Sequence, residues 1–419
     1  MSLSTDPQVI HAKPVTERKR IIGSVNKNQI PSDILDNKEL NHSIATRLPN
    51  NYNFEFHKII WRLKTCNARR VGLQFPEGLF VFAITIADII EHFAEVDVII
   101  MGDVTYGACC VEDLMADAMD CDFIVHFGHS CLIPVNQMVN NIKVLYVFVD
   151  IKIDLWHLIE TIKTNFNPQT HYLSISGTVQ FVSSIHSASK ELRQRHGFQV
   201  LAPQAKPLSP GEVLGCTAPQ LPQEVNTIIF VADGRFHLEA LMIANPSVNA
   251  FKYNPYNKEI TQEFYDFNKM MSYRKNAINS ATKVCTDSGV FGIILGTLGR
   301  QGNPKVLENL KSNICKFSKC QTISVLLPEI RPEVLGMFTK VDAWVQIACP
   351  RLSIDWGNNF THKPLLTPFE LNVTLNTVTK EFISLKSKYA MDFYETNSSG
   401  NWTPNHKCNQ NCCCNENNK

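Results

Sequence analysis

Short apolar runs rich in Val, Ile and Phe alternate with helical patterns along most of this chain. The first part contains the runs "RRVGLQF", "VDVII", "CDFIVHF" and "NIKVLYVFVD", with the helical stretches "LFVFAITIADIIEHFAE" and "VEDLMADAMD" between them. Buried strands that alternate with helices are typical of βαβ units around a parallel sheet. The alternation therefore predicts an α/β domain.

The same order of elements recurs twice. A second copy runs from "THYLSISGTVQ" to "NAFKYNPY", and a third, after a long amphipathic stretch, runs from "VFGIILGTLGRQGN" to "VDAWVQIACPRLSIDWG". Such self-similarity indicates repeated structural units, so we expect three similar Rossmann-like α/β domains with parallel sheets. The expected divisions are a polar, partly disordered leader at 1–52, domains at 53–165, 166–280 and 281–395, and a Cys/Asn-rich tail at 396–419 that is disordered at its end.

Charge and hydropathy narrow the class of protein. The 419 residues are 44% hydrophobic and 19% charged, and 40 basic residues nearly balance 39 acidic ones. No global field therefore draws the chain to nucleic acid or to an anionic membrane. The start lacks an apolar signal segment, and no run of about 18 apolar residues follows it. We expect a cytoplasmic protein with neither a nucleic-acid nor a membrane partner.

Three of the 14 cysteines occupy comparable places in the three copies. Cys109 in "TYGAC", Cys216 in "VLGC" and Cys349 in "IACP" each follow a strand or close a loop with Gly or Pro. Ligands of open α/β sheets gather outside the carboxyl ends of strands. Three thiolates around one point suit an iron-sulfur cluster with one iron left open, or a zinc with an open position. The alternative for each thiol is plain burial as a small apolar group.

The remaining cysteines are expected to be structural. Cys110, Cys121 and Cys131 should pack around Cys109, and Cys66, Cys285, Cys315 and Cys320 have no matching partner in the repeat. The terminal "CNQNCCC" has no core to fix ligands, so we expect only adventitious metal affinity there.

Two further features have more than one interpretation. His126 and His129 lie near a strand end, where they suit zinc ligation, or a hydrogen bond from His129 to the carboxylate of a small ligand. The Gly-rich loop at 296–304 offers backbone N–H groups and Arg300 to a carboxylate or phosphate, but it lacks the ending of a P-loop.

Several long motifs, in order, carry a resemblance to a known family. These are "DVTYGACCVEDLMADAMDCDFIVHFGHSCLIP", "PLSPGEVLGCTAP", "VADGRFHLEALMIANP", "GTLGRQGNPKVLENL", "QIACPRLSIDWG" and "YAMDFYETNSSGNWTPNH". Together they resemble the subunit 1 family of 2-(3-amino-3-carboxypropyl)histidine synthase, which acts in diphthamide biosynthesis. The resemblance runs from about Ile59 to His406.

The resemblance implies both an architecture and a set of ligands. It implies three α/β domains in a pseudo-three-fold arrangement around a central 4Fe-4S cluster, held by Cys109, Cys216 and Cys349. The fourth iron would meet S-adenosylmethionine. The residues that we place near this cofactor are His129, Ser130, Arg300, Gln301 and Arg351. Arg351 would pair with the methionyl carboxylate, and its alternative role is an ion pair between domains.

The implied reaction is the first step of diphthamide biosynthesis. Reductive cleavage of S-adenosylmethionine would give a 3-amino-3-carboxypropyl radical that adds to C2 of a histidine of translation elongation factor 2, with release of methylthioadenosine. The chain lacks the C-x-x-x-C-x-x-C triad of ordinary radical enzymes. The implied partners are a homologous second subunit in a heterodimer, elongation factor 2 as protein substrate, and a small iron-binding electron donor.

Other functions remain open at this point. One alternative is a non-catalytic scaffold or electron relay that binds the cluster. Another is a dehydratase similar to quinolinate synthase, in which no radical forms. Dependence on S-adenosylmethionine separates these alternatives. A zinc or thiol oxidoreductase is the weakest hypothesis, because the chain contains no C-x-x-C.

Overall fold

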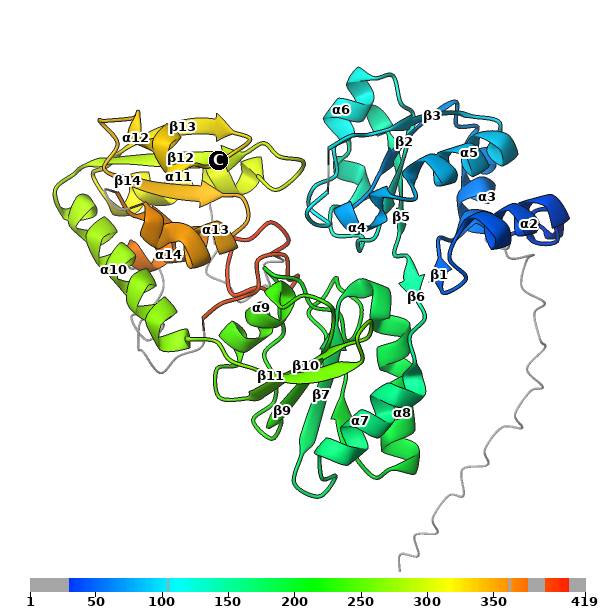
Figure 1. The fold of residues 1–419 in the computed structure, drawn as a ribbon. Coiled ribbons are helices and arrows are strands. Elements are labelled where there is room, and N and C mark those ends of the chain that lie inside the picture. Colours follow the sequence, from blue (N-terminus) through cyan, green and yellow to red (C-terminus); the bar gives the residue numbers. More distant parts are fainter. Residues whose placement is uncertain (1–29, 104, 361–362, 376–388, 407–419) are drawn as a thin grey trace, which may run out of the picture.

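The computed structural model describes residues 30–103, 105–360, 363–375 and 389–406. Three α/β parts, each with its own sheet, are arranged around a common middle (Figure 1). The predicted fold class is confirmed.

The first part has a four-stranded parallel sheet of order β3-β2-β4-β5. Its strands are β2 (Arg70–Gln74), β3 (Asp97–Ile100), β4 (Phe123–Phe127) and β5 (Lys143–Val147). Its helices are α3 (Phe56–Cys66), α4 (Glu77–Phe80), α5 (Ala83–Ala94) and α6 (Asp113–Ala118), with short 3-10 turns at Val135–Gln137 and Val139–Asn141. Every residue of β4 is buried, as expected for a strand covered on both faces.

The second part has a five-stranded sheet of order β11-β10-β9-β7-β8. Its strands are β7 (Tyr172–Gly177), β8 (Gln199–Leu201), β9 (Thr227–Val231), β10 (Asn249–Asn254) and β11 (Glu259–Glu263), and its helices are α7 (Leu155–Asn165), α8 (Val182–Arg195) and α9 (Phe236–Ala244), with a 3-10 turn at Val179–Phe181. Only β11 runs antiparallel to its neighbour β10. The small antiparallel pair β1 (Tyr52–Asn53) and β6 (Asp150–Ile151) lies where the first and second parts join (Figure 1).

The third part has a four-stranded parallel sheet of order β13-β12-β14-β15. Its strands are β12 (Val290–Gly296), β13 (Gln321–Leu327), β14 (Ala343–Ile347) and β15 (Leu365–Leu366). Its helices are α10 (Phe267–Thr286), α11 (Pro304–Phe317), α12 (Pro332–Gly336), α13 (Arg351–Trp356) and α14 (Pro368–Thr374), with a 3-10 turn at Gly357–Asn359.

The connecting helices cover the parts that follow them. α7 packs against α8, and α10 packs against α13 and α14. The predicted domain boundary at 165 falls at the end of α7, and that at 280 falls inside α10. Periodicity reveals an amphipathic helix but does not tell which sheet its apolar face will cover.

Order begins earlier than the sequence suggests. Residues 30–52, which we placed in the leader, contain α1 (Ser32–Leu35) and α2 (Lys38–Arg47). Asn37 caps α2 by accepting a hydrogen bond from the Leu40 backbone N–H at 3.0 Å, and Leu40 is 1% exposed. Residues 1–29 of the predicted leader and the thiols of the tail beyond 406 lie outside the described residues.

The segment at 389–406 returns to the middle of the molecule (Figure 1). The Ala218 N–H donates to the Met391 carbonyl at 2.7 Å, and the Phe393 N–H donates to the Cys216 carbonyl at 3.2 Å. Trp402 lies 5.9 Å from Phe369 between ring centroids. This C-terminal segment therefore fastens the loop that carries Cys216.

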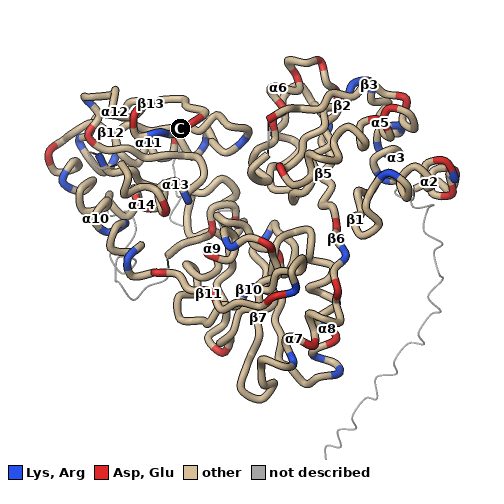
Figure 2. The backbone as a smooth tube through the Cα atoms, viewed as in Figure 1, with Lys and Arg blue, Asp and Glu red and all other residues tan. Residues whose placement is uncertain are grey.

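Charges of both signs are mixed over all three parts (Figure 2). Among the helices of the described residues, none combines the length and apolar character needed to cross a membrane.

Candidate functional site

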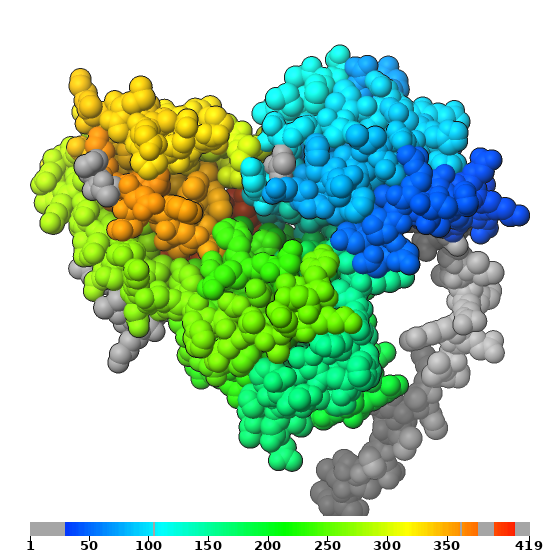
Figure 3. Space-filling view, viewed as in Figure 1, coloured from blue at the N-terminus to red at the C-terminus, as the bar shows by residue number. Residues whose placement is uncertain are grey.

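The three repeat cysteines line one cavity of about 590 Å³. Cys109 comes from the first part, Cys216 from the second and Cys349 from the third. Figure 3 shows the surface hollowed where the three parts meet. We call this space, which also contacts Leu214, Phe236 and His237, the thiol cavity.

Local hydrogen bonds hold each cysteine loop in place. The Cys109 carbonyl accepts from the Arg300 N–H at 2.8 Å, which ties the first part to the Gly-rich loop of the third. The Cys349 carbonyl, just past β14, accepts from the side chain of Gln346 at 2.9 Å. The Thr217 hydroxyl lies 3.7 Å from the Cys216 sulfur. The three thiols are therefore placed by the folded backbone of three different parts.

The pKa values of the three repeat cysteines are raised, whereas a hydrogen bond with Cys109 lowers the pKa of the neighbouring Cys110 to about 7. The pKa of Cys109 is raised well above its usual value, first by a hydrogen bond with Cys110, then by burial and by repulsion from Cys216 and Cys349. Burial, followed by repulsion from Cys349, raises the pKa of Cys216 to about 12. Burial also raises the pKa of Cys349. Only a strongly cationic group would hold all three as thiolates.

The donor set is one that an iron-sulfur cluster accepts. Within the described ranges, no group of three or more His, Cys, Asp or Glu side chains is arranged to hold one metal ion, including around His126 and His129. A zinc ion needs sulfur ligands at about 2.3 Å from the metal. Thiolates are the ligands of iron-sulfur clusters, and a cavity of about 590 Å³ lined by three thiols from three parts has room for one.

Arg351 bridges the second and third parts at the wall of the thiol cavity. Its side chain is 3% exposed and forms ion pairs with Glu239 at 2.5 Å and Asp355 at 2.8 Å. It also donates to the Phe236 carbonyl at 2.8 Å, and its guanidinium carbon lies 4.3 Å from the centroid of the Phe236 ring. The sequence offered a cofactor carboxylate or an interdomain ion pair as its partner, and the contacts in this structure are those of the ion pair.

Arg300 and Gln301 join the first and third parts. Arg300 pairs with Asp113, whose Oδ1 accepts from Arg300 Nε at 2.7 Å, and Asp113 is 1% exposed. Gln301 lines the thiol cavity, and its side-chain nitrogen lies 3.4 Å from the Cys110 sulfur. Of these two predicted cofactor contacts, only Gln301 lies along the cavity.

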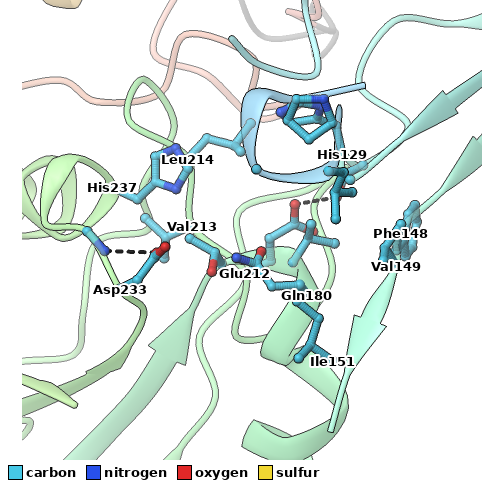
Figure 4. A pocket seen from close by; sticks show the side chains of 18 of the residues that line it. His129, Phe148, Val149, Ile151, Gln180, Glu212, Val213, Leu214, Asp233 and His237 are labelled. Atoms are coloured by element: carbon cyan, nitrogen blue, oxygen red, sulfur yellow. Dashed lines mark hydrogen bonds between the residues drawn. The ribbon is translucent and has the colours of Figure 1, made fainter. Parts of the chain in front are cut away.

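His129 and Ser130 line a different cavity of about 330 Å³ between the first and second parts (Figure 4). We call it the side cavity. It adjoins the thiol cavity, because Leu214, Phe236 and His237 line both. Of the five predicted cofactor residues, His129 and Ser130 thus line the side cavity, Gln301 and Arg351 line the thiol cavity, and Arg300 lines neither.

Sequence reasoning missed Glu212, His237 and the C-terminal Tyr394. Glu212 is fully buried, Tyr394 is 2% exposed, and burial raises the pKa of Tyr394 well above its usual value, with a further rise from the three thiols. All three residues lie in motifs that carry the family resemblance. For Tyr394 this motif was the available signal. No local pattern within the motifs marks Glu212 or His237. Cys110 and Cys121 are buried as expected, whereas Cys131, expected to be buried, is exposed because it lies in the loop after β4.

Comparisons with known proteins identify relatives of nearly the whole chain. The model of a family described as "Putative diphthamide synthesis protein" matches residues 75–383. The chain is 52% identical to 2-(3-amino-3-carboxypropyl)histidine synthase subunit 1 of Schizosaccharomyces pombe, over 94% of this chain and 88% of that protein. It is 50% identical to the Homo sapiens protein of the same name, over 90% of this chain and 83% of that protein.

Two solved structures share the fold. A crystal structure of Dph2 from Pyrococcus horikoshii with a 4Fe-4S cluster matches with a TM-score of 0.62 and 24% identity, over 81% of this chain and 93% of that one. A second crystal structure of Dph2 from Pyrococcus horikoshii matches with a TM-score of 0.60 and 25% identity, over 79% and 91%.

Proposed function

The chain belongs to the diphthamide synthesis protein family, and we propose that it is the catalytic subunit for the first step of that pathway. In this proposal it cleaves S-adenosylmethionine and transfers the 3-amino-3-carboxypropyl group to C2 of a histidine of elongation factor 2. The observation that carries the proposal is the meeting of Cys109, Cys216 and Cys349 in one cavity. The names of the relatives and the cluster in the archaeal structure support it.

The three cysteines would hold a 4Fe-4S cluster. When bound, such a cluster would supply the one electron for reductive cleavage of S-adenosylmethionine between its sulfonium sulfur and the aminocarboxypropyl carbon, with methylthioadenosine as the leaving group. Four cysteines line the cavity, and three of them, Cys109, Cys216 and Cys349, occupy the repeat positions. With these three as its ligands, a 4Fe-4S cluster would keep one iron open.

The chain's own residues would enclose and orient the reacting groups. Leu132, Leu214 and Leu298 give the thiol cavity an apolar wall that limits water. The ion pairs of Arg351 with Glu239 and Asp355 fix the second part against the third. These ion pairs thereby hold the walls of the cavity in place. Orientation of the bond to be broken is the protein's main task with such a cofactor.

The remaining partners follow from the same proposal. A homologous second subunit would complete a heterodimer, as the words "subunit 1" in the relatives' names suggest, and a small iron-binding protein would deliver electrons. Elongation factor 2 would be the protein substrate.

An anaerobic assay tests the proposal. The purified chain, with and without the second subunit, receives dithionite and S-adenosylmethionine, and methylthioadenosine is followed. We expect product from the wild type and none from Cys216→Ala, whereas Cys315→Ala, which removes an exposed thiol of α11, should match the wild type. A fully loaded cluster that gives no product with partner and elongation factor present would refute the catalytic role and favour a scaffold or a dehydratase.

A further inference from the structure

The side cavity has an acidic group at its wall that the proposed cleavage does not use. Glu212 comes from the second part and is 0% exposed. Its Oε1 accepts a hydrogen bond from the hydroxyl of Ser130 in the first part, and its Oε2 accepts from the Ser209 N–H at 3.0 Å. Both Ser130 and Glu212 line the cavity. A buried carboxyl group is costly to fold and is common at functional sites.

Two uncharged imidazole rings share the side cavity with this pair. His129 and His237 both line it (Figure 4). Burial lowers the pKa of each to about 4, so both rings are neutral at physiological pH. The Nδ1 atom of His129 is buried and has no hydrogen-bond partner among the described residues. A neutral imidazole ring can donate one hydrogen bond and accept another from a polar ligand, and it does not repel a cationic ligand.

The side cavity has exposed residues in its wall and shares part of that wall with the thiol cavity. Tyr256, at its wall, is 55% exposed, and the neighbouring Asp233 and Gly234 are exposed too. On its inner side it adjoins the thiol cavity through Leu214, Phe236 and His237. A group that enters from the surface would therefore lie next to the wall that the side cavity shares with the thiol cavity.

We propose that the side cavity receives the imidazole side chain of the protein acceptor, with Ser130 and Glu212 as its hydrogen-bonding partners. This inference rests on the proposed function. The thiol cavity, at about 590 Å³, is the larger space and takes S-adenosylmethionine, while about 330 Å³ suits a single side chain and its backbone. The buried carboxyl accepts a ring N–H and thereby orients C2 of the imidazole toward the thiol cavity.

Separate measurement of cleavage and transfer tests the inference. The variants are Ser130→Ala and Glu212→Gln, with Ser187→Ala on the exposed face of α8 as the matched control. Methylthioadenosine released without acceptor is measured first in each variant, so that transfer can be expressed per cleavage event, and it should stay at the wild-type level in Ser187→Ala. Transfer to elongation factor 2 per methylthioadenosine released should fall about tenfold or more in the first two, because a hydrogen bond to the acceptor is lost. Ser187→Ala should transfer normally.

A second kind of variant, which leaves the buried pair of Ser130 and Glu212 unchanged, keeps the inference testable if substitutions in that pair cause misfolding. A Cβ at Gly234 meets nothing within 4 Å, so Gly234→Leu should fold and narrow the outer mouth of the side cavity. We expect it to weaken binding of elongation factor 2, measured by calorimetry on the complete enzyme, with iron content and affinity for S-adenosylmethionine unchanged. Binding does not depend on turnover, so this readout is independent of activity.

Other outcomes would overturn the inference. If cleavage and transfer fell together, and affinity for S-adenosylmethionine with them, the side cavity would serve the cofactor. If none of the variants changed transfer or acceptor binding, the acceptor would enter elsewhere. A wild-type enzyme that releases no methylthioadenosine would refute the proposed function itself, which is a distinct result.

Discussion

Replacement of Arg351 by glutamine should weaken the joint between the second and third parts. The guanidinium is 3% exposed, and its carboxylate partners Glu239 and Asp355 have side chains that are 19% and 23% exposed. Arg351→Gln leaves Asp355 without its cation in a half-buried site, whereas Glu239 loses one cation and keeps its ion pair with Arg235 at 2.8 Å. Loss of one partner from a buried ion pair costs about 3–5 kcal/mol. Because the partners retain some water contact, we expect a loss of about 3 kcal/mol in the free energy of unfolding.

Urea unfolding of the wild type and the variant measures this loss. Trp344 is 1% exposed in β14 and reports on the third part. The matched control is Arg195→Gln, which breaks an exposed pair with Glu191 on α8, where the Arg195 side chain is 74% exposed. The control should lose less than about 1 kcal/mol. If Arg351→Gln lost no more than this control, the claim that Arg351 holds the two parts together would be refuted.

Three further predictions concern other contacts of the site. Gly299 has φ 53°, and a Cβ there would lie 2.6 Å from the Cys110 Cα, so Gly299→Ala should lower the free energy of unfolding by at least about 1–2 kcal/mol and lower the iron content. Gly234→Ala is the control, and a Gly299→Ala variant with wild-type iron content would contradict this prediction. Arg274 is 2% exposed, pairs with the fully buried Glu370 at 2.6 Å and donates to the Ser353 carbonyl of α13. Arg274→Met should therefore destabilise the chain by about 3–5 kcal/mol in urea unfolding, and a loss below about 1 kcal/mol would count against this prediction. Burial lowers the pKa of His126 well below its usual 6.5, so the unfolded chain binds more protons and the free energy of unfolding should fall as pH drops below about 6.5. His126→Gln should remove about one proton, or about 1.4 kcal/mol per pH unit, from that slope, and an unchanged slope would refute the assignment.

Local patterns predicted the sheets because central strands such as β4, β9 and β14 are buried on both faces. The run "FIVHF" is continuous in apolar residues apart from His126, and all of β4 is buried. The antiparallel β11 was not predicted, because direction within a sheet depends on the connection and not on the strand's own residues. α1 and α2 were missed because each of them buries a single residue, Ile34 and Leu40, in a polar stretch.

From the sequence, only the site residues at repeat positions could be predicted. The repeat position singled out Cys109, Cys216 and Cys349, and all three line one cavity. Glu212 meets Ser130, 82 residues away, through the packing of two parts, which no local spacing can reveal. The Gly-rich loop was expected to hold an anion, yet its Arg300 pairs with Asp113 and its backbone binds the Cys109 loop.

Iron and sulfide determination on single cysteine variants tests the central claim most directly. The wild type and the Cys109→Ala, Cys216→Ala, Cys349→Ala and Cys121→Ala variants are reconstituted anaerobically under one protocol. We predict about four iron atoms per chain for the wild type and for Cys121→Ala, and a large loss in each of the other three, because in the proposed ligand set every part supplies one ligand. Retention of a full, spectroscopically unchanged cluster in any of those three variants would contradict a ligand set shared among the three parts.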